Sequence, residues 1–334
     1  MATIILQPRP ATLFAKVRPL EDSTQRKQLC SKRPIRPSQA FAAKTPTARA
    51  STTGATPASA ADHRQRPKLH LGLFEIGKPL GKGKFGRVYL ARHRTSGFVC
   101  ALKVLNKDEV VAEGAEAHVR REIEVHSQLR HPAVIGFHGW FHDSRRIFII
   151  QEFAAGGELY KSLRKAGRFS QRRAAAYAAQ VSQSLAYLHG RNVMHRDLKP
   201  ENILVGLRGE LKLADFGYSV YAPSNRRQTL CGTLDYLPPE MLNQRKPSYS
   251  RAVDQWTLGV LTYEFLTGEP PFEEDQIHMT KKRIVAGDMK PLPSSICPEA
   301  RDFVHSLLQQ DPAKRLPLAE VMNHPWIKKY CAKQ

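Results

Sequence analysis

Two short segments carry most of the chemistry that this sequence can perform. Residues 195–202 read His-Arg-Asp-Leu-Lys-Pro-Glu-Asn, and an Asp-Phe-Gly tripeptide begins thirteen residues later at Asp215. Asp197 can accept a proton from an attacking hydroxyl, and Lys199 can reach a phosphate as a point charge. Asn202 and Asp215 supply hard oxygen ligands of the kind that Mg²⁺ prefers. These residues predict transfer of a phosphoryl group to a hydroxyl.

A second group of residues, nearer the N-terminus, can hold a nucleotide. Residues 81–88 read Gly-Lys-Gly-Lys-Phe-Gly-Arg-Val, and the glycines let the backbone approach a triphosphate. Alone this pattern is weak evidence, because dinucleotide-binding folds also use it, but there a helix follows and here a strand does. Lys103 follows Gly86 by seventeen residues and can bind the α- and β-phosphates. Glu122 is the expected ion partner of Lys103, and Glu124 is the alternative.

The candidate nucleotide-binding residues run from the glycine segment to the Asp-Phe-Gly tripeptide. They are Leu80, Gly81, Lys82, Gly83, Lys84, Phe85, Gly86, Val88, Ala101, Lys103, Glu122, Glu152, Ala154, Glu158, Glu201, Asn202, Leu204 and Asp215. We expect Phe85 to cover the triphosphate, and backbone groups of Glu152 and Ala154 to bind the adenine edge. Gln151 would lie at the back of the pocket, where we expect its amide to bond nearby backbone.

The segment from Asp215 to Glu240 contains a threonine whose phosphorylation could regulate activity. Thr229 follows Arg226-Arg227-Gln228, and a phosphate on it would add negative charge that Arg196 could bind, which would order the segment. Thr233 can bridge Asp197 and Lys199 through its hydroxyl. We expect Glu240 to form a structural ion pair with Arg315. We also expect Asp254 to cap the backbone of residues 195–202, the catalytic loop.

Acidic residues near the site suggest which substrates it accepts. Glu158 and Glu201 stand where they could bind arginines that precede the target hydroxyl, through charge-assisted bidentate pairs. This favours Arg-x-Ser/Thr sites, and Arg226-Arg227-Gln228-Thr229 could be a self-substrate. Lys199 after the catalytic Asp favours Ser/Thr over Tyr targets.

Apolar periodicity predicts a β-rich part followed by a helical part. Strands are expected at 74–90 (two, around a glycine turn), 99–105, 135–141 and 146–152, and helices at 118–129, 158–165, 171–189, 250–267, 279–285, 299–309 and 318–324.

Composition limits the remaining possibilities. The chain has 334 residues and a net charge of +22, and residues 1–72 contain 13 Lys/Arg but only 3 Asp/Glu. That N-terminal segment is rich in Pro, Ala, Ser and Thr without apolar periodicity, so we predict a disordered basic extension that could attract polyanions. Its first twenty residues lack acids, so a transit peptide is an alternative.

No apolar run is long enough to span a membrane. Five scattered cysteines without a Cys-x-x-Cys pair fit a reducing compartment.

The order of these motifs resembles that of eukaryotic protein kinases. Within them, residues 74–77, 81–86, 120–122, 141–143 and above all 226–241 (Arg-Arg-Gln-Thr-Leu-Cys-Gly-Thr-Leu-Asp-Tyr-Leu-Pro-Pro-Glu-Met) are similar to the Aurora family. The resemblance implies an α+β protein-kinase fold over residues 73–328, with a small β-rich N-lobe (about 73–152), a larger helical C-lobe (about 157–328) and a short tail at 329–334.

The Aurora resemblance also implies a biological role. It implies an ATP- and Mg²⁺-dependent serine/threonine kinase in nucleus and cytoplasm, acting at kinetochore, centromere and spindle during mitosis. Histone, kinetochore and spindle proteins would be substrates, chromatin or microtubules indirect partners, and an inner-centromere-protein-like activator would bind the N-lobe. Two residues depart from the family: Tyr218 stands where Trp is usual, and Gln151 where Leu is usual. We expect Tyr218 to pack as Trp would, and Gln151 to alter inhibitor sensitivity.

Two alternatives remain open at this stage. One is another basophilic kinase, such as the cyclic-nucleotide-dependent type, which usually has a long C-terminal extension returning to the small lobe. The other is a kinase-fold scaffold that only binds partners. The complete set of Lys103, Glu122, Asp197, Asn202 and Asp215 favours a working enzyme over a pseudokinase.

Overall fold

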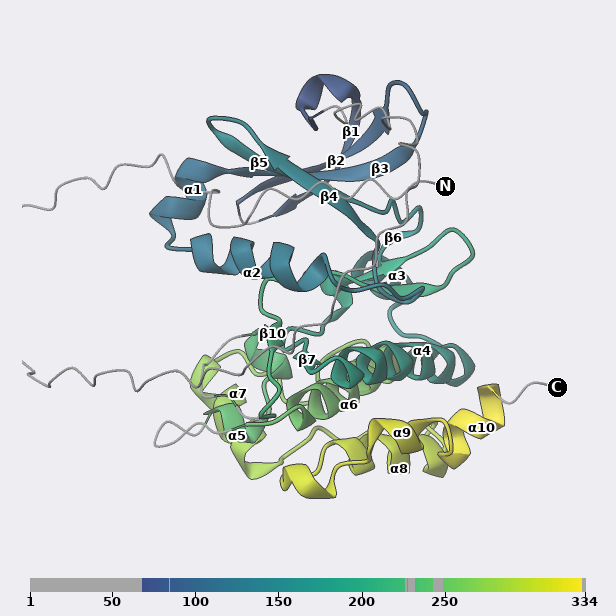
Figure 1. The fold of residues 1–334 in the computed structure, drawn as a ribbon. Coiled ribbons are helices and arrows are strands. Elements are labelled where there is room, and N and C mark those ends of the chain that lie inside the picture. Colours follow the sequence, from purple (N-terminus) through teal and green to yellow (C-terminus); the bar gives the residue numbers. More distant parts are fainter. Residues whose placement is uncertain (1–67, 84, 226, 228–231, 243–248, 332–334) are drawn as a thin grey trace, which may run out of the picture. The chain divides into compact units, whose positions relative to one another are not determined.

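The computed structural model describes residues 68–83, 85–225, 227, 232–242 and 249–331. In these residues a β-sheet lobe is followed by a helical lobe, which gives the expected α+β class (Figure 1). Several sequence predictions fall outside the described residues, namely those on the extension at 1–67, on Lys84, on Thr229 and on the last three residues of the tail.

The N-lobe is built on one antiparallel sheet. Its strand order is β1-β2-β3-β5-β4. The strands are β1 (Phe74–Gly83), β2 (Gly86–His93), β3 (Val99–Asn106), β4 (Phe137–His142) and β5 (Arg146–Gln151). Both faces of β5 are buried, because Ile147 and Ile149 pack toward one cluster while Phe148 and Ile150 pack toward another.

Two helices, α1 (Lys107–Ala112) and α2 (Glu116–His126), follow β3. In Figure 1, α2 lies beneath the sheet, on the side of the C-lobe. Val119 and Ile123 pack into the same cluster as Ile147 and Ile149. The helical spacing of 119, 122, 123 and 126 therefore places Glu122 and His126 on the buried face of α2 as well.

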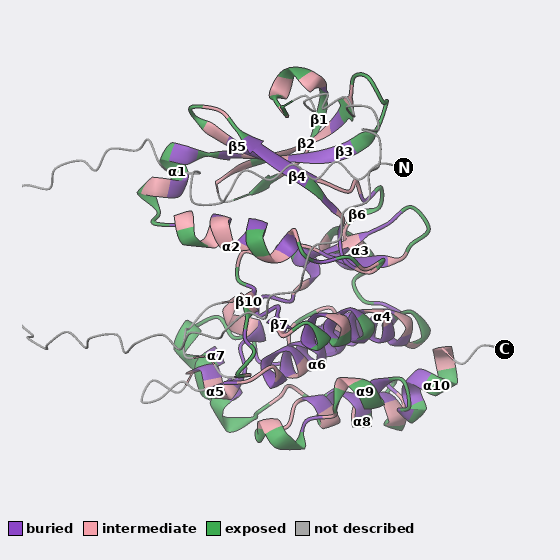
Figure 2. Ribbon diagram, in the orientation of Figure 1, coloured by how far each residue is buried: buried purple, intermediate pink, exposed green. Residues whose placement is uncertain are grey.

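The C-lobe is centred on α4 (Gln171–Gly190) and α6 (Ala252–Thr267), which contact each other. α6 is buried nearly all round, and Figure 2 shows both helices mainly in the colour of buried residues. Around them lie α3 (Leu159–Ala166), α5 (Pro239–Leu242), α7 (Ile277–Ala286), α8 (Pro298–Leu307), α9 (Leu318–Val321) and α10 (Pro325–Cys331).

Short strands frame the segments that carry the chemical motifs. They are β6 (Gly157–Glu158), β7 (Val193–Met194), β8 (Ile203–Val205), β9 (Leu211–Leu213) and β10 (Val220–Tyr221). They form two small sheets, β6-β8-β9 and β7-β10. The His-Arg-Asp loop therefore leaves β7 and returns through β8, while the Asp-Phe-Gly tripeptide lies between β9 and β10.

The structure corrects some of the element predictions. The helix expected at 318–324 ends at Val321 in α9, and a separate helix, α10, starts at Pro325. Pro325 fixes its own φ and disfavours the α conformation for the residue before it, so it begins a helix and does not continue one. The strand expected from Ile135 begins at Phe137. The short helix α1 and strands β6 to β10 were not expected.

Among the described residues, no helix combines the length and apolar character that crossing a bilayer requires.

A buried ion pair anchors the end of the segment from Asp215 to Glu240, which we call the activation segment, to the C-lobe. Both Nη atoms of Arg315 lie 2.7 Å from the Glu240 carboxylate oxygens, and Nη1 also donates to the Ala252 carbonyl. The Arg315 side chain is fully buried and that of Glu240 is 14% exposed. This is the pair expected from the sequence.

We expect Glu240→Ala to lower the free energy of unfolding by about 3–5 kcal/mol, because it leaves the buried Arg315 guanidinium without its carboxylate. Urea titration followed by circular dichroism measures this. Glu274→Ala, which breaks the more exposed pair with Arg283, is the matched control and should cost less than about 1 kcal/mol. Equal losses in the two variants would contradict the buried-pair assignment.

Candidate active site

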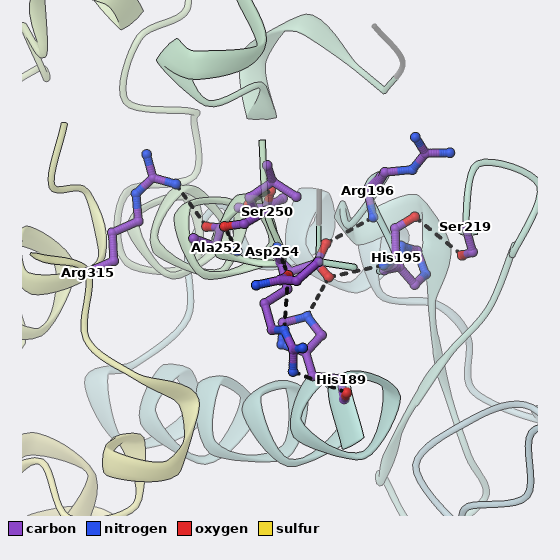
Figure 3. Close-up of polar contacts among 12 residues, drawn as sticks. His189, His195, Arg196, Ser219, Ser250, Ala252, Asp254 and Arg315 are labelled. Atoms are coloured by element: carbon purple, nitrogen blue, oxygen red, sulfur yellow. Dashed lines mark hydrogen bonds and ion pairs between the residues drawn. The ribbon is translucent and has the colours of Figure 1, made fainter. Parts of the chain in front are cut away.

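The site is built upward from a carboxylate on α6. Asp254 is fully buried. Its Oδ2 accepts hydrogen bonds from His189 Nε2 (2.7 Å) and from the His195 backbone N–H (3.0 Å) (Figure 3). Its Oδ1 accepts a hydrogen bond from the Arg196 backbone N–H (2.9 Å). Burial alone would raise the pKa of Asp254, but the hydrogen bonds from His189 and Arg196 outweigh it and lower the pKa. Asp254 therefore caps the catalytic loop as a charged acceptor.

This contact fixes a strained backbone. Arg196 has a φ of 69°, in the left-handed region that non-glycine residues rarely occupy, at a cost of about 1–3 kcal/mol. The Ser219 hydroxyl adds a bond to the His195 carbonyl, so the loop is held from the α6 side and from the activation segment (Figure 3). The surrounding contacts thus offset the cost of this conformation. The conformation of Arg196 in turn sets the direction in which the next residue, Asp197, points.

The Asp197 carboxylate lies in a ring of donors. Oδ2 accepts from Asn202 Nδ2 at 2.8 Å and lies 3.2 Å from Lys199 Nζ. Oδ1 accepts from the Thr233 hydroxyl (3.0 Å) and backbone N–H (3.1 Å). Lys199 also donates to the Thr233 hydroxyl at 2.7 Å, so Thr233 bridges Asp197 and Lys199 as expected from the sequence.

Lys103 of β3 pairs with Glu122 of α2 and not with the alternative, Glu124. Its Nζ lies 2.6 Å from Glu122 Oε1, whose side chain is 5% exposed. Burial lowers the pKa of Lys103, but the charges of Glu122 and Asp215 outweigh that effect and raise it. Burial raises the pKa of Asp215, and the charge of Lys103 outweighs this and lowers it. Lys103 therefore stabilises the charged form of Asp215, whereas burial, together with the charge of Asp215, raises the pKa of Glu122.

A column of rings links α2 to the two motif segments. The Phe216 ring is fully buried, 4.7 Å from the His126 ring and 5.4 Å from the His195 ring, and His126 lies 5.3 Å from Phe137. His126 Nε2 also contacts the Ile135 carbonyl at 2.7 Å. Burial lowers the pKa of His126 to about 4, so the ring is neutral near pH 7. Sequence reasoning missed His126; only its place on the apolar face of α2 marks it.

The glycine segment forms the turn between β1 and β2. A Cβ on Gly86 would lie 1.9 Å from the Val104 carbonyl oxygen, so no side chain fits there. A Cβ on Gly81 would lie 3.5 Å from Glu158 Oε1, which places Glu158 beside this turn. Phe85 packs against the apolar cluster shared by β3, α1 and α2. Lys82 and Gly83 precede the turn on β1.

The strand register shows which face of the sheet carries the other candidate nucleotide-binding residues. Val88 of β2 pairs with Lys103, and Ala101 of β3 pairs with Gln151 at the end of β5. These residues therefore share the sheet face that carries Lys103 toward α2. Leu80 lies on β1 in the glycine segment, and Leu204 lies on β8 in the C-lobe.

The segment after β5 connects the two lobes. The Glu152 N–H donates to the Gly136 carbonyl at 2.8 Å, and the Glu152 carboxylate pairs with Lys212 at 2.9 Å. The Glu152 N–H is thus already used, which leaves its carbonyl and the Ala154 N–H for a base edge. Among the described residues the Gln151 amide forms no hydrogen bond, so the backbone bond expected for it is not found.

The residues fit a divalent cation with hard oxygen ligands. No group of three or more His, Cys, Asp or Glu side chains in the described part of the chain could hold a metal by itself. Asp215 supplies a charged carboxylate, and Asn202, whose Nδ2 donates to Asp197, keeps its Oδ1 for a ligand. The Ala214 N–H donates to the Asn202 carbonyl at 2.9 Å, which joins the two segments. One carboxylate and one amide suit a cation that keeps water and phosphate ligands.

An acidic group beside the catalytic loop was only partly anticipated. Glu201 is exposed, and its charge, with those of Asp235 and Glu273, acts on Glu264 of α6. Burial is the main cause that raises the pKa of Glu264 to about 7, and its oxygen accepts from the Tyr236 hydroxyl. Glu158 pairs with Lys161 at 3.3 Å. Sequence reasoning named Glu158 and Glu201 but missed Glu264, which lies among apolar residues of a buried helix.

Comparison with known proteins agrees with this geometry. A protein kinase domain model matches residues 74–327. The chain is 57% identical over 264 residues to an Aurora kinase of Schizosaccharomyces pombe, covering 79% of this chain and 74% of that protein. It is 54% identical over 260 residues to Aurora kinase B of Danio rerio (78% and 80% covered). It is 51% identical over 274 residues to Aurora kinase A-A of Xenopus laevis (82% and 67% covered).

These matches cover the lobes that hold the Lys103–Glu122 pair, the His-Arg-Asp loop and the Asp-Phe-Gly segment. A protein kinase domain uses ATP together with a divalent metal ion. The chain therefore belongs to the Aurora family of serine/threonine protein kinases.

Proposed function

We propose that this kinase transfers the γ-phosphoryl group of Mg-ATP to Ser and Thr hydroxyls, with Asp197 as the residue that accepts the hydroxyl proton. The observation that carries the proposal is the donor ring around Asp197, in which Asn202, Lys199 and Thr233 all contact one carboxylate. Such a ring orients the carboxylate for a hydroxyl bound in the cleft. Lys199 is placed to neutralise charge that develops on the transferred group.

Other residues would place the nucleotide. Lys103, fixed by Glu122, would bind the α- and β-phosphates, and the glycine turn would cover them with backbone N–H groups. Asn202 and Asp215 would hold Mg²⁺, which supplies charge neutralisation on the phosphates when bound. The Glu152 carbonyl and the Ala154 N–H would bind the base, between Leu80, Val88 and Ala101 on one side and Leu204 on the other.

Asp197→Asn tests the central role directly. We expect kcat to fall by about 10²–10⁴-fold, because an amide cannot accept the proton, while the KM for ATP and the melting temperature stay near wild-type values. Steady-state transfer of phosphate to an Arg-Arg-x-Ser peptide measures this. A variant that retains more than half of the wild-type kcat would exclude Asp197 as the proton acceptor.

We also propose that the substrates carry arginine upstream of the target residue. The acidic group of Glu201, Asp235, Glu264 and Glu273 supports this, because these carboxylates act on one another and a guanidinium would neutralise their charge. Glu158 lies next to the glycine turn, which makes it a second acidic candidate for binding an arginine.

The pKa of Glu264, about 7, gives this proposal a pH signature. A raised pKa means that Glu264 is neutral below pH 7 and gains its charge above it. We expect the KM for an Arg-Arg-x-Ser peptide to fall about threefold between pH 6 and pH 8, equivalent to about 0.6 kcal/mol. The same peptide with Ala in place of both Arg residues is the control. The same pH dependence for both peptides would exclude Glu264 from arginine recognition.

Phosphorylation of Thr229 is proposed as the activating modification. Its support is Arg196, which is 6% exposed and directly precedes Asp197 in the loop held by Asp254. A phosphate that binds Arg196 would tie the activation segment to that loop.

Thr229→Ala should therefore lower kcat/KM for the peptide about tenfold or more, a change of about 1.4 kcal/mol in transition-state stabilisation. Kinetics on fully phosphorylated wild-type enzyme and on the variant, with phosphorylation verified by mass spectrometry, measure the effect. An unchanged kcat/KM would contradict the proposed switch.

The cellular role is proposed from family membership. It comprises phosphorylation of histone, kinetochore and spindle proteins in nucleus and cytoplasm during mitosis, at sites on chromatin or microtubules. An open hollow of about 590 Å³ between α2 of the N-lobe and the C-lobe, lined by Arg121, Glu124, Val125, Arg191 and Tyr221 among others, offers a surface for an activator that contacts α2. Adding an inner-centromere-protein tail fragment to the kinase assay tests this, and activity indifferent to the fragment would contradict it.

A further inference from the structure

Tyr249, just before α6, contacts both parts of the proposed switch. Its ring is 3% exposed and packs with Met194, Leu237 and Val253. Its hydroxyl accepts a hydrogen bond from Arg196 Nη1 at 2.6 Å. Its backbone N–H and carbonyl pair with the carbonyl and N–H of Arg227, each at 3.0 Å. One residue thus joins the catalytic loop through its side chain and the activation segment through its backbone.

The guanidinium of Arg196 is fixed along two edges. Nη1 donates to the Tyr249 hydroxyl, and Nε donates to the Tyr218 carbonyl at 2.7 Å. Tyr218 directly follows the Asp-Phe-Gly tripeptide, and its ring packs edge-on against His118 of α2 at 5.4 Å. A guanidinium is a rigid plane, so two contacts in that plane fix the orientation of the whole group.

We propose that Tyr249 is a positioning residue, whose hydroxyl orients Arg196 to receive the phosphate of the activation segment. The proposal rests on the proposed function, since it assumes that Thr229 is phosphorylated. Thr229 follows Arg227 by two residues in the sequence, and Tyr249 pairs its backbone with Arg227 while its hydroxyl contacts Arg196. Tyr249 would act through Arg196, which its hydroxyl contacts.

The alternative role for Tyr249 is simple packing of its ring in the C-lobe. The two roles differ in what they require of the hydroxyl. Packing needs only the ring, which Phe retains, whereas orientation of Arg196 needs the oxygen. Loss of the oxygen also removes an acceptor from a buried N–H, so the guanidinium plane would no longer be fixed on that edge.

The experiment is a double-mutant cycle in the full-length chain. Wild type, Tyr249→Phe, Thr229→Ala and the double variant are assayed with an Arg-Arg-x-Ser peptide, after mass spectrometry of the Thr229 phosphate. We expect Tyr249→Phe to lower kcat about three- to tenfold with the KM for ATP within about twofold, and to have less than about a twofold effect in the Thr229→Ala background. Phosphatase should also remove phosphate from Thr229 faster in Tyr249→Phe.

The control is Tyr177→Phe in α4, which removes another hydroxyl that accepts from an arginine, Arg173 at 2.9 and 3.1 Å, and whose ring packs against Phe169 and Phe265. It should leave kcat and KM unchanged.

The outcomes separate the two proposals. Full activity of Tyr249→Phe beside an impaired Thr229→Ala would overturn the role of Tyr249 and leave the phosphorylation switch standing. Equal losses from Tyr249→Phe in both backgrounds would show that it acts independently of the phosphate, which also overturns the coupling. A fully active Thr229→Ala would overturn the switch itself, and with it the positioning role.

Discussion

The buried carboxylate of Asp254 is the constraint on which the catalytic geometry depends. It lies in the most buried helix of the C-lobe and accepts from three donors that belong to α4 and to the His-Arg-Asp loop. These bonds help to offset the cost of the left-handed backbone at Arg196. That backbone conformation determines where Asp197 points. Contacts with the core of the C-lobe therefore position the proton acceptor.

The same loop connects this core to both lobes and to the activation segment. His195 contacts Phe216, and Phe216 contacts His126 on α2, the helix that also presents Glu122 to Lys103. Arg196 extends the other way, to the Tyr218 carbonyl and the Tyr249 hydroxyl. A structural change in the activation segment can therefore be transmitted to Asp197 through Arg196. A shift of α2 can be transmitted to Asp215 through Phe216. Both routes consist of packed or hydrogen-bonded neighbours.

The sequence predicted the parts of this arrangement that depend on local patterns. The apolar spacing of Val119 and Ile123 places Glu122 on the buried face of α2, so its pairing with Lys103 could be foreseen. The contacts of Tyr249 and Glu264 could not, because they depend on how α6 packs against segments far away in the chain. The strands β6 to β10 are too short to show alternation, and α10 begins at a proline that reads as the end of an element.

The most direct test of this account is the activity of Asp254→Asn. The amide keeps the shape of the carboxylate but turns an N–H toward one of the donors, which removes at least one bond to the loop at a cost of about 1–3 kcal/mol. We expect kcat for phosphate transfer to fall about tenfold or more, with the protein still folded by circular dichroism. Asp302→Asn, at a side chain that is 74% exposed, should keep the wild-type rate. A folded Asp254→Asn enzyme with a kcat within twofold of wild type would contradict the claim that this carboxylate positions Asp197.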